Sequence, residues 1–193
     1  MKRLIAMFAA GVLLCVCGAA RADRSSSLHR KGHNVLVGLD TEFSVPLGNY
    51  SDVNSVGAGA IVTGELPLLD AVSATARVGF QAHADRTIAG LGSHVHAIPF
   101  LLGARYNVSG DRQGIFGAFE LGMFDLMSSV DRRAGGGAIT TTTSNDVRFG
   151  MGVGVGLQQD RWSLRVNVHT QDVSNFGSSV VLTGGIGCQF ASF

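Results

Sequence analysis

Charged residues are scarce in this sequence. They occupy 15% of its 193 positions, against roughly 25% in ordinary soluble domains, and the formal net charge is only +1. So small a charge provides no cationic field to attract phosphates, which excludes a generic nucleic-acid-binding protein. Three cysteines are too few for a disulfide-stapled miniprotein, and a hydrophobic content of 46% excludes a disordered chain.

The first 22 residues have the layout of a secretory signal peptide. Residues 1–3 are basic, residues 4–18 are uncharged and mostly apolar, and Ala20-Arg21-Ala22 places small residues where a signal peptidase cuts. The apolar run is shorter than the ~20 residues that a membrane-spanning helix needs. We expect cleavage after Ala22; an uncleaved anchor and a lipoprotein cut before Cys15 or Cys17 are the alternatives.

Cleavage would leave residues 23–193 and change the charge. The chain would lose three of its 15 basic residues and none of its 14 acidic ones, giving a net charge of −2, and would keep only Cys188. No apolar run in this part approaches 18 residues, so we expect no transmembrane helix. Residues 23–31 are polar and serine-rich and form a short tether in this interpretation, with one domain over residues 32–193.

Apolar residues in that domain recur with a period of two. Alternation with polar residues or glycine is clean over residues 35–45, 72–83, 146–158 and 162–171, and weaker over 57–66, 96–107, 115–126 and 180–193. Since successive side chains of a strand point to opposite faces, each segment is predicted to be a strand with one apolar face. The pattern therefore predicts eight strands.

The predicted connections alternate between short and long. The short ones span residues 66–71, 107–113 and 158–161, and the long ones, rich in Gly, Ser, Thr and Asn, span 46–56, 85–95, 127–145 and 172–179. Short turns at one end and long loops at the other describe an up-and-down meander, and an even number of strands lets it close without an exposed edge. The sequence therefore predicts an all-β, eight-stranded antiparallel β-barrel.

The polar faces indicate which side of this barrel meets water. They carry acids, arginines and many glycines, which suit a narrow lumen better than a surface open to water. Apolar side chains would then face lipid, and strands of about 10 residues match a tilted crossing of a bilayer. The fold class is thus a transmembrane β-barrel. A soluble periplasmic, lipocalin-like barrel that binds an apolar ligand is the alternative.

Eight charged residues are predicted to face the lumen, and they are the most informative group of side chains in the sequence. Charges inside an eight-stranded barrel lie far from bulk water and must be paired. We expect a structural plug, with a gated narrow path as the alternative, and the strand register needed to assign the pairs cannot be deduced. The residues are Asp40, Glu42, Glu65, Arg77, Arg105, Glu120, Arg148 and Arg165.

Two segments resemble a known family. Residues 98–106, Ile-Pro-Phe-Leu-Leu-Gly-Ala-Arg-Tyr, are similar to the mid-barrel strand of many small bacterial outer-membrane β-barrels. The C-terminal strand, with Thr183, Gly185, Cys188, Phe190 and the final Phe193, resembles the signal read by the barrel insertion machinery. The chain thus resembles the outer membrane protein A-like or porin-like superfamily, which implies the outer membrane as its location after export.

Three aromatic residues fit this interpretation. Tyr106, Trp162 and Phe190 lie on the predicted apolar face near the short-turn end, where an interfacial aromatic belt would lie. The expected partners are outer-membrane lipid and the insertion machinery, and the ligand of the outer loops is open.

Other motifs give weaker indications. The glycines of residues 150–156 recur every second residue, which is a stripe on one face and not a nucleotide-binding GxGxxG loop. His94 and His96, with His83 nearby in the sequence, could bind a metal together with Asp85, or could be a polar pair near the outer loops. No GxSxG nucleophile motif is present, so we expect no catalysis and no cofactor. Residues 132–145 could be an adhesive tip or simply a solvated loop.

The function predicted from these patterns is structural or interactive. An outer-membrane barrel with a plugged polar lumen would support the envelope or make surface contacts through its long loops. A narrow porin-like channel for small solutes is the second hypothesis, and the soluble apolar-ligand binder is the third.

Overall fold

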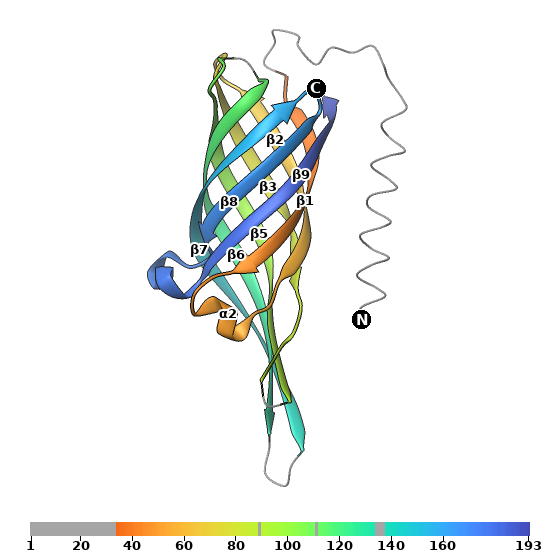
Figure 1. Ribbon diagram of the computed structural model, residues 1–193, viewed down its shortest axis with the longest axis vertical. Helices are drawn as coiled ribbons and strands as arrows, with labels where there is room; N and C mark the ends of the chain where they lie inside the picture. The colour runs from red at the N-terminus through yellow and green to blue at the C-terminus, as the bar shows by residue number, and fades with distance from the viewer. Residues whose placement is uncertain (1–33, 89, 111, 134–137) are drawn as a thin grey trace.

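The strands of this chain form one closed barrel (Figure 1). The computed structural model describes residues 34–193 except 89, 111 and 134–137, so the predicted signal peptide (1–22) and tether (23–31) lie outside the described residues. The barrel strands are β1 (Leu36–Pro46), β2 (Gly57–Pro67), β3 (Val72–His83), β5 (Leu91–Asn107), β6 (Gly114–Arg133), β7 (Ile139–Gln159), β8 (Trp162–Thr170) and β9 (Val180–Ser192).

Every strand of the barrel pairs antiparallel with its neighbours along the chain. The ring closes because β1 pairs with β9 over the whole length of β1, from Leu36 to Pro46. On the other side β3 pairs with β5, since β4 (Arg86–Ile88) is a short strand within their connection. The prediction of a closed, eight-stranded, up-and-down antiparallel barrel is therefore confirmed.

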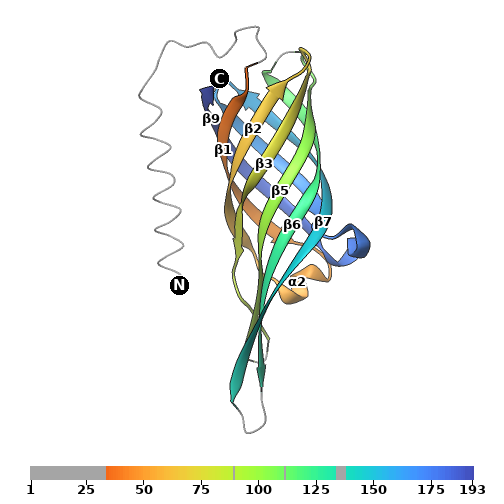
Figure 2. The same cartoon turned by 180° about the vertical axis from the view of Figure 1, so that it is seen from behind.

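The two ends of the barrel differ. The short connections and both ends of the described chain lie at one end, where Val35 and Phe193 exchange backbone hydrogen bonds of 3.0 Å (Figure 2). The other end carries α2 (Tyr50–Val53), β4 and the 3-10 helix η1 (Val173–Ser178). Across the described residues, no helix combines the length and the apolar character that crossing a membrane requires.

The prediction of a long loop over residues 127–145 is wrong for most of these residues. β6 continues to Arg133 and β7 begins at Ile139, and the two pair in register as a hairpin that projects beyond the barrel (Figures 1 and 2). The apolar alternation ends before this hairpin does, because both of its faces are polar. Strand structure persists there because β-branched threonines favour it and the backbone stays paired.

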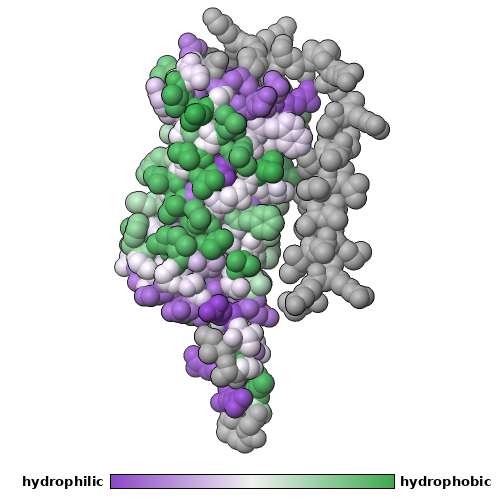
Figure 3. Space-filling model, in the orientation of Figure 1, coloured by the Kyte–Doolittle hydropathy of each residue, from purple (hydrophilic) through white to green (hydrophobic). Residues whose placement is uncertain are grey.

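Apolar side chains cover the outside of the barrel and polar ones fill it. On the face shown in Figure 3, hydrophobic side chains form a band around the middle, and hydrophilic ones lie toward both ends. Outward-facing Phe43, Leu102 and Val155 are 73%, 64% and 63% exposed. Inward positions on the same strands hold buried Asp40, Arg105 and similar residues. The barrel is thus inverted relative to a water-soluble one.

The inward face of β7 is a wall of glycines. A Cβ at Gly150 would collide with the ring of Phe124, and one at Gly156 would collide with the ring of Phe116. Both rings project from β6 into the lumen and are fully buried. The missing side chains on β7 therefore make the room that two aromatic rings occupy, which is why the lumen is filled despite so many glycines.

We expect Gly156→Ala to destabilise the barrel by about 1–3 kcal/mol, because Phe116 and the Leu164 carbonyl leave no space for the added methyl group. Gly117→Ala is the matched control, since a Cβ there meets nothing within 4 Å. Urea unfolding in detergent micelles, followed by the fluorescence of Trp162, the single tryptophan, measures both. Equal stabilities of the two variants would contradict a filled lumen.

Candidate functional site: the charged lumen

The centre of the lumen is organised around Arg77 of β3. Its Nη1 donates to both carboxylate oxygens of Glu120, at 3.2 and 2.9 Å. Its Nη2 donates to Asp40 Oδ2 at 3.3 Å and also to Glu42 Oε1. One guanidinium thus joins β1, β3 and β6 across the barrel, although β6 is a neighbour of neither of the other two strands.

Two further side chains bond to the carboxylates around Arg77. Arg165 Nη1 of β8 donates to Glu120 Oε1 at 2.7 Å, and Gln81 Nε2 donates to Glu42 Oε2 at 3.1 Å. We call Asp40, Glu42, Arg77, Glu120 and Arg165 the central cluster; all five are at least 92% buried. Buried charges of this kind are tolerated only when paired and hydrogen-bonded, so each member depends on the others.

A second group lies toward the short-turn end. Arg105 Nη1 donates to Glu65 Oε2 at 3.2 Å and to Gln158 Oε1 at 3.1 Å, and its Nε donates to Asn107 Oδ1 at 3.0 Å. The Arg105 guanidinium also lies 3.8 Å from the ring centroid of Phe116, with that of Arg165 at 5.4 Å. Both arginines therefore lie within cation–π distance of the Phe116 ring.

Seven of the eight predicted lumen charges thus come together, and Arg148 does not. Arg148 has the inward-facing parity of β7, but β8 pairs with β7 only as far as Met151 and Thr170. Beyond that point no strand covers it, so its side chain is 43% exposed. It instead pairs with Asp146 through a 2.7 Å hydrogen bond from Nε and with Asp172 at 3.4 Å. The prediction that Arg148 lies in the lumen is therefore wrong.

The loop end of the lumen is covered by residues that the sequence did not single out. The side chain of Asn54 bonds to the backbone of Val95 like a strand partner, donating to its oxygen at 3.1 Å and accepting from its nitrogen at 2.9 Å. Tyr50 of α2 is 6% exposed, and burial raises its pKa to about 12. Tyr50 is an aromatic residue within a long polar connection, and this was the feature of the sequence from which its burial could have been predicted.

The histidines near this end have separate partners. His94 Nδ1 lies 2.5 Å from Asp85 Oδ1, whereas His96 Nδ1 accepts the backbone N–H of His83 at 3.1 Å. The rings of His94 and His96 stack with centroids 4.4 Å apart. Within the part of the chain that the structure describes, no group of three or more His, Cys, Asp or Glu side chains is arranged to hold a metal.

The three aromatic residues predicted for an interfacial belt lie on the outside of the barrel. Tyr106, Trp162 and Phe190 are 56%, 44% and 56% exposed. Each belongs to the short-turn half of its strand: Tyr106 pairs with Val72 at the start of β3, and Trp162 pairs with Cys188 near the end of β9. The three side chains thus lie outside the barrel and toward its short-turn end, and their role as an interfacial belt stays a prediction.

Known proteins resemble this chain in structure and not in sequence. No protein-family model matches the chain, and no curated protein matches its sequence. Among solved structures, Ail, the attachment invasion locus protein of Yersinia pestis, matches with a TM-score of 0.58 and 8% identity over 83% of this chain and 99% of Ail. The N-terminal β-barrel domain of Pseudomonas aeruginosa OprF matches with a TM-score of 0.51 and 12% identity over 83% and 100%.

The fold is that of the small eight-stranded outer-membrane β-barrels. A second structure of Ail, in complex with the heparin analogue sucrose octasulfate, matches with a TM-score of 0.54 and 8% identity over 83% of this chain and 98% of Ail. At such identities the likeness concerns architecture, so the residues of the lumen must be understood from their own geometry.

We expect Arg77→Met to cost about 3–5 kcal/mol of folding free energy, because three buried carboxylates lose their shared partner. Arg148→Met, which removes the same charge from an exposed position, should cost less than about 1 kcal/mol. Thermal unfolding of the two purified variants in the same detergent, monitored by circular dichroism, compares them. If Arg148→Met destabilised the protein as much as Arg77→Met does, the result would contradict the assignment of Arg77 to the lumen and of Arg148 to an exposed position.

Proposed function

We propose that this protein spans the bacterial outer membrane and acts there as a structural or surface-contact protein. One observation carries the proposal: exposed apolar side chains surround the barrel while its interior holds paired charges. Lipid around the barrel would remove the outward apolar side chains from water, whereas in solution they would form a large exposed apolar surface. The soluble alternative needs the reverse arrangement, with its apolar face inside.

The orientation follows from the two ends of the barrel. Short turns of outer-membrane barrels face the periplasm and longer connections face outward. In this proposal the β6–β7 hairpin projects from the cell, and the ligand that it contacts is open. Residues 1–22 direct export, and Thr183, Gly185, Cys188, Phe190 and Phe193 of the C-terminal strand are read by the barrel insertion machinery.

A plugged lumen favours a structural role over transport. The central cluster crosses the barrel from β1 and β3 to β6 and β8, and its charges bond to one another. A permeating solute would have to break these bonds within an interior just wide enough for side chains. The proposal includes no catalytic step and no cofactor; its partner is the lipid of the outer membrane.

We expect Val153→Arg and Val166→Arg each to hinder assembly, because an arginine on the lipid face near midplane costs about 2–4 kcal/mol. Thr142→Arg is the control, since it places the same residue on the exposed hairpin of the same strand as Val153. The readout is mobility in SDS gels of the outer-membrane fraction, unheated and boiled. Wild type and Thr142→Arg should shift on boiling; a soluble, unshifted wild-type protein would contradict membrane insertion.

Conductance measurements distinguish a plugged barrel from a narrow channel. We expect the purified barrel to be silent in planar lipid bilayers, because the central cluster blocks its lumen. Detergent without protein provides the blank, and the heat-dependent gel shift verifies that the sample is folded. Discrete current steps that vanish when the sample is boiled would favour a narrow channel for small solutes instead.

A further inference from the structure

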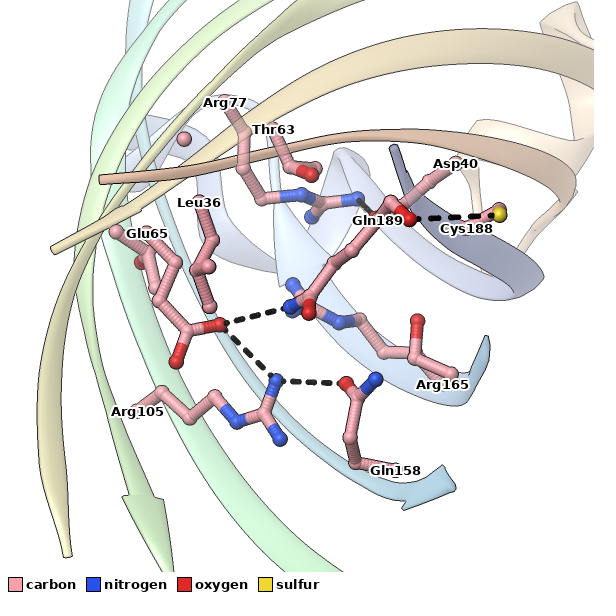
Figure 4. Close-up of a pocket in the computed structure, with 13 residues that line it drawn as sticks. Leu36, Asp40, Thr63, Glu65, Arg77, Arg105, Gln158, Arg165, Cys188 and Gln189 are labelled. Carbon is pink, nitrogen blue, oxygen red and sulfur yellow. Dashed lines mark hydrogen bonds and ion pairs between the residues drawn. The ribbon is translucent and has the colours of Figure 1, made fainter. Parts of the chain in front are cut away.

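A small cavity lies in the lumen between the central cluster and the short-turn end of the barrel (Figure 4). Besides three arginines, its lining carries many oxygen atoms, from two carboxylates, three hydroxyl groups and two side-chain amides. The cavity has room for about two water molecules, or for one monovalent cation and one water molecule. The two carboxylates are those of Asp40 and Glu65.

Glu65 lines this cavity with one carboxylate oxygen unused. Its Oε2 accepts from Arg105 Nη1 at 3.2 Å and from Gln189 Nε2 at 3.5 Å, as the dashed lines of Figure 4 show. Its Oε1 is buried and has no hydrogen-bond partner among the described residues, and the side chain is 91% buried. A buried carboxylate oxygen without a partner is costly, which indicates that a further group binds here.

Thr75 provides a second unused oxygen in the same lining. It lies directly opposite Glu65 in the pairing of β2 with β3, and it is 8% exposed. Its Oγ1 is buried and, like Glu65 Oε1, has no hydrogen-bond partner in the described part of the chain. Two neighbouring strands therefore present oxygen atoms to the cavity that no described side chain satisfies.

The buried charges of the described lumen do not balance. Four carboxylates face three guanidiniums, so one negative charge is in excess. The central cluster has two arginines for three carboxylates, and the remaining arginine pairs with the remaining carboxylate. A buried charge without compensation is costly, so the lumen requires one further positive charge. The carboxylates are those of Asp40, Glu42, Glu65 and Glu120, and the guanidiniums are those of Arg77, Arg105 and Arg165.

The two buried histidines of the lumen, His83 and His169, do not suit this role. A charged imidazolium carries an N–H donor on each of its two nitrogens. His83 Nδ1 and His169 Nε2 are buried and have no hydrogen-bond partner among the described residues. Protonation of either ring would therefore leave a charged donor unpaired, which is more costly than an unpaired neutral nitrogen.

We propose that the cavity binds one small monovalent cation, Na⁺ or K⁺, in contact with Glu65 Oε1 and Thr75 Oγ1. Hard cations of this kind bind oxygen atoms, and the lining supplies them. One positive charge matches the excess of one negative charge, whereas Ca²⁺ would exceed it and takes roughly six to eight oxygen ligands. The site has only two carboxylates, in agreement with the lack of a three-residue metal group among the described residues.

The arginines in the lining leave room for such a cation because their charges are already paired. Arg105 bonds to Glu65 Oε2, on the oxygen that the cation does not use. Arg77 and Arg165 bond to the carboxylates of the central cluster. The cation would thus join the Arg105–Glu65 pair to the central cluster and stabilise the folded barrel.

The unfolding temperature of the purified barrel in a non-ionic detergent tests this site. We expect NaCl or KCl to raise it above the value in tetramethylammonium chloride at the same concentration, because the organic cation is too large for the cavity although the ionic strength is equal. The increase should grow with the logarithm of the salt concentration above the Kd. Asp70→Asn, which removes an exposed carboxylate from the β2–β3 turn, should leave the difference between the salts unchanged.

Two variants locate the effect in the cavity. Glu65→Gln should abolish the difference between the salts, because it removes both the excess charge and a carboxylate ligand. This variant also takes an ionic partner from Arg105, so Thr75→Val provides a test if it fails to fold. Thr75→Val keeps every charge, and it should raise several-fold the NaCl concentration that gives half of the stabilisation.

Equal unfolding temperatures of the wild-type protein in the three salts would overturn the proposal. A fall in stability with rising pH in every salt would then identify a bound proton as the compensating charge, and stability independent of pH would leave water alone in the cavity. A salt difference that persists unchanged in Glu65→Gln or Thr75→Val would equally overturn it. The measurement concerns the folded barrel in detergent, so its outcome is separate from the tests of membrane insertion and conductance.

Discussion

Charge pairing inside a narrow barrel is the constraint on which the rest of this structure depends. Arg77 contacts three carboxylates from two other strands, and none of these groups can reach bulk water. Eight strands enclose a lumen with room for side chains and little else, so a charge there is stable only with its partners in place. The central cluster therefore links strands that are not neighbours and holds the barrel closed from within.

The same geometry explains the composition of the strands. Polar and charged residues occupy the lumen, so the apolar residues of each strand must face outward. Glycines on β7 leave the volume that Phe116 and Phe124 fill from β6, and the Phe116 ring in turn contacts the guanidiniums of Arg105 and Arg165. Low overall charge, abundant glycine and outward apolar residues are thus three consequences of one architecture.

The loop end has its own organisation. Asp131 accepts hydrogen bonds from the Gly92 backbone at 3.1 Å and from Thr141 Oγ1 at 2.7 Å, which ties β5, β6 and β7 together beyond the barrel. Asp172 pairs with Arg148 and caps η1, so the last connection is held to the base of the hairpin. The described part of the hairpin is therefore tied by hydrogen bonds to the neighbouring strand β5 as well as within itself.

The sequence by itself determined the strands and their faces, because side chains alternate strictly along a strand and one residue's parity fixes the orientation of the next. It placed Asp40, Arg77 and Glu120 inward on that basis. Only the tertiary structure decided which charges meet, since Arg77 reaches Glu120 across strands whose relative stagger no local pattern encodes. The end of β8 at Thr170 likewise left Arg148 outside the lumen, and backbone pairing made the threonine-rich segment a hairpin, although neither of its faces is apolar.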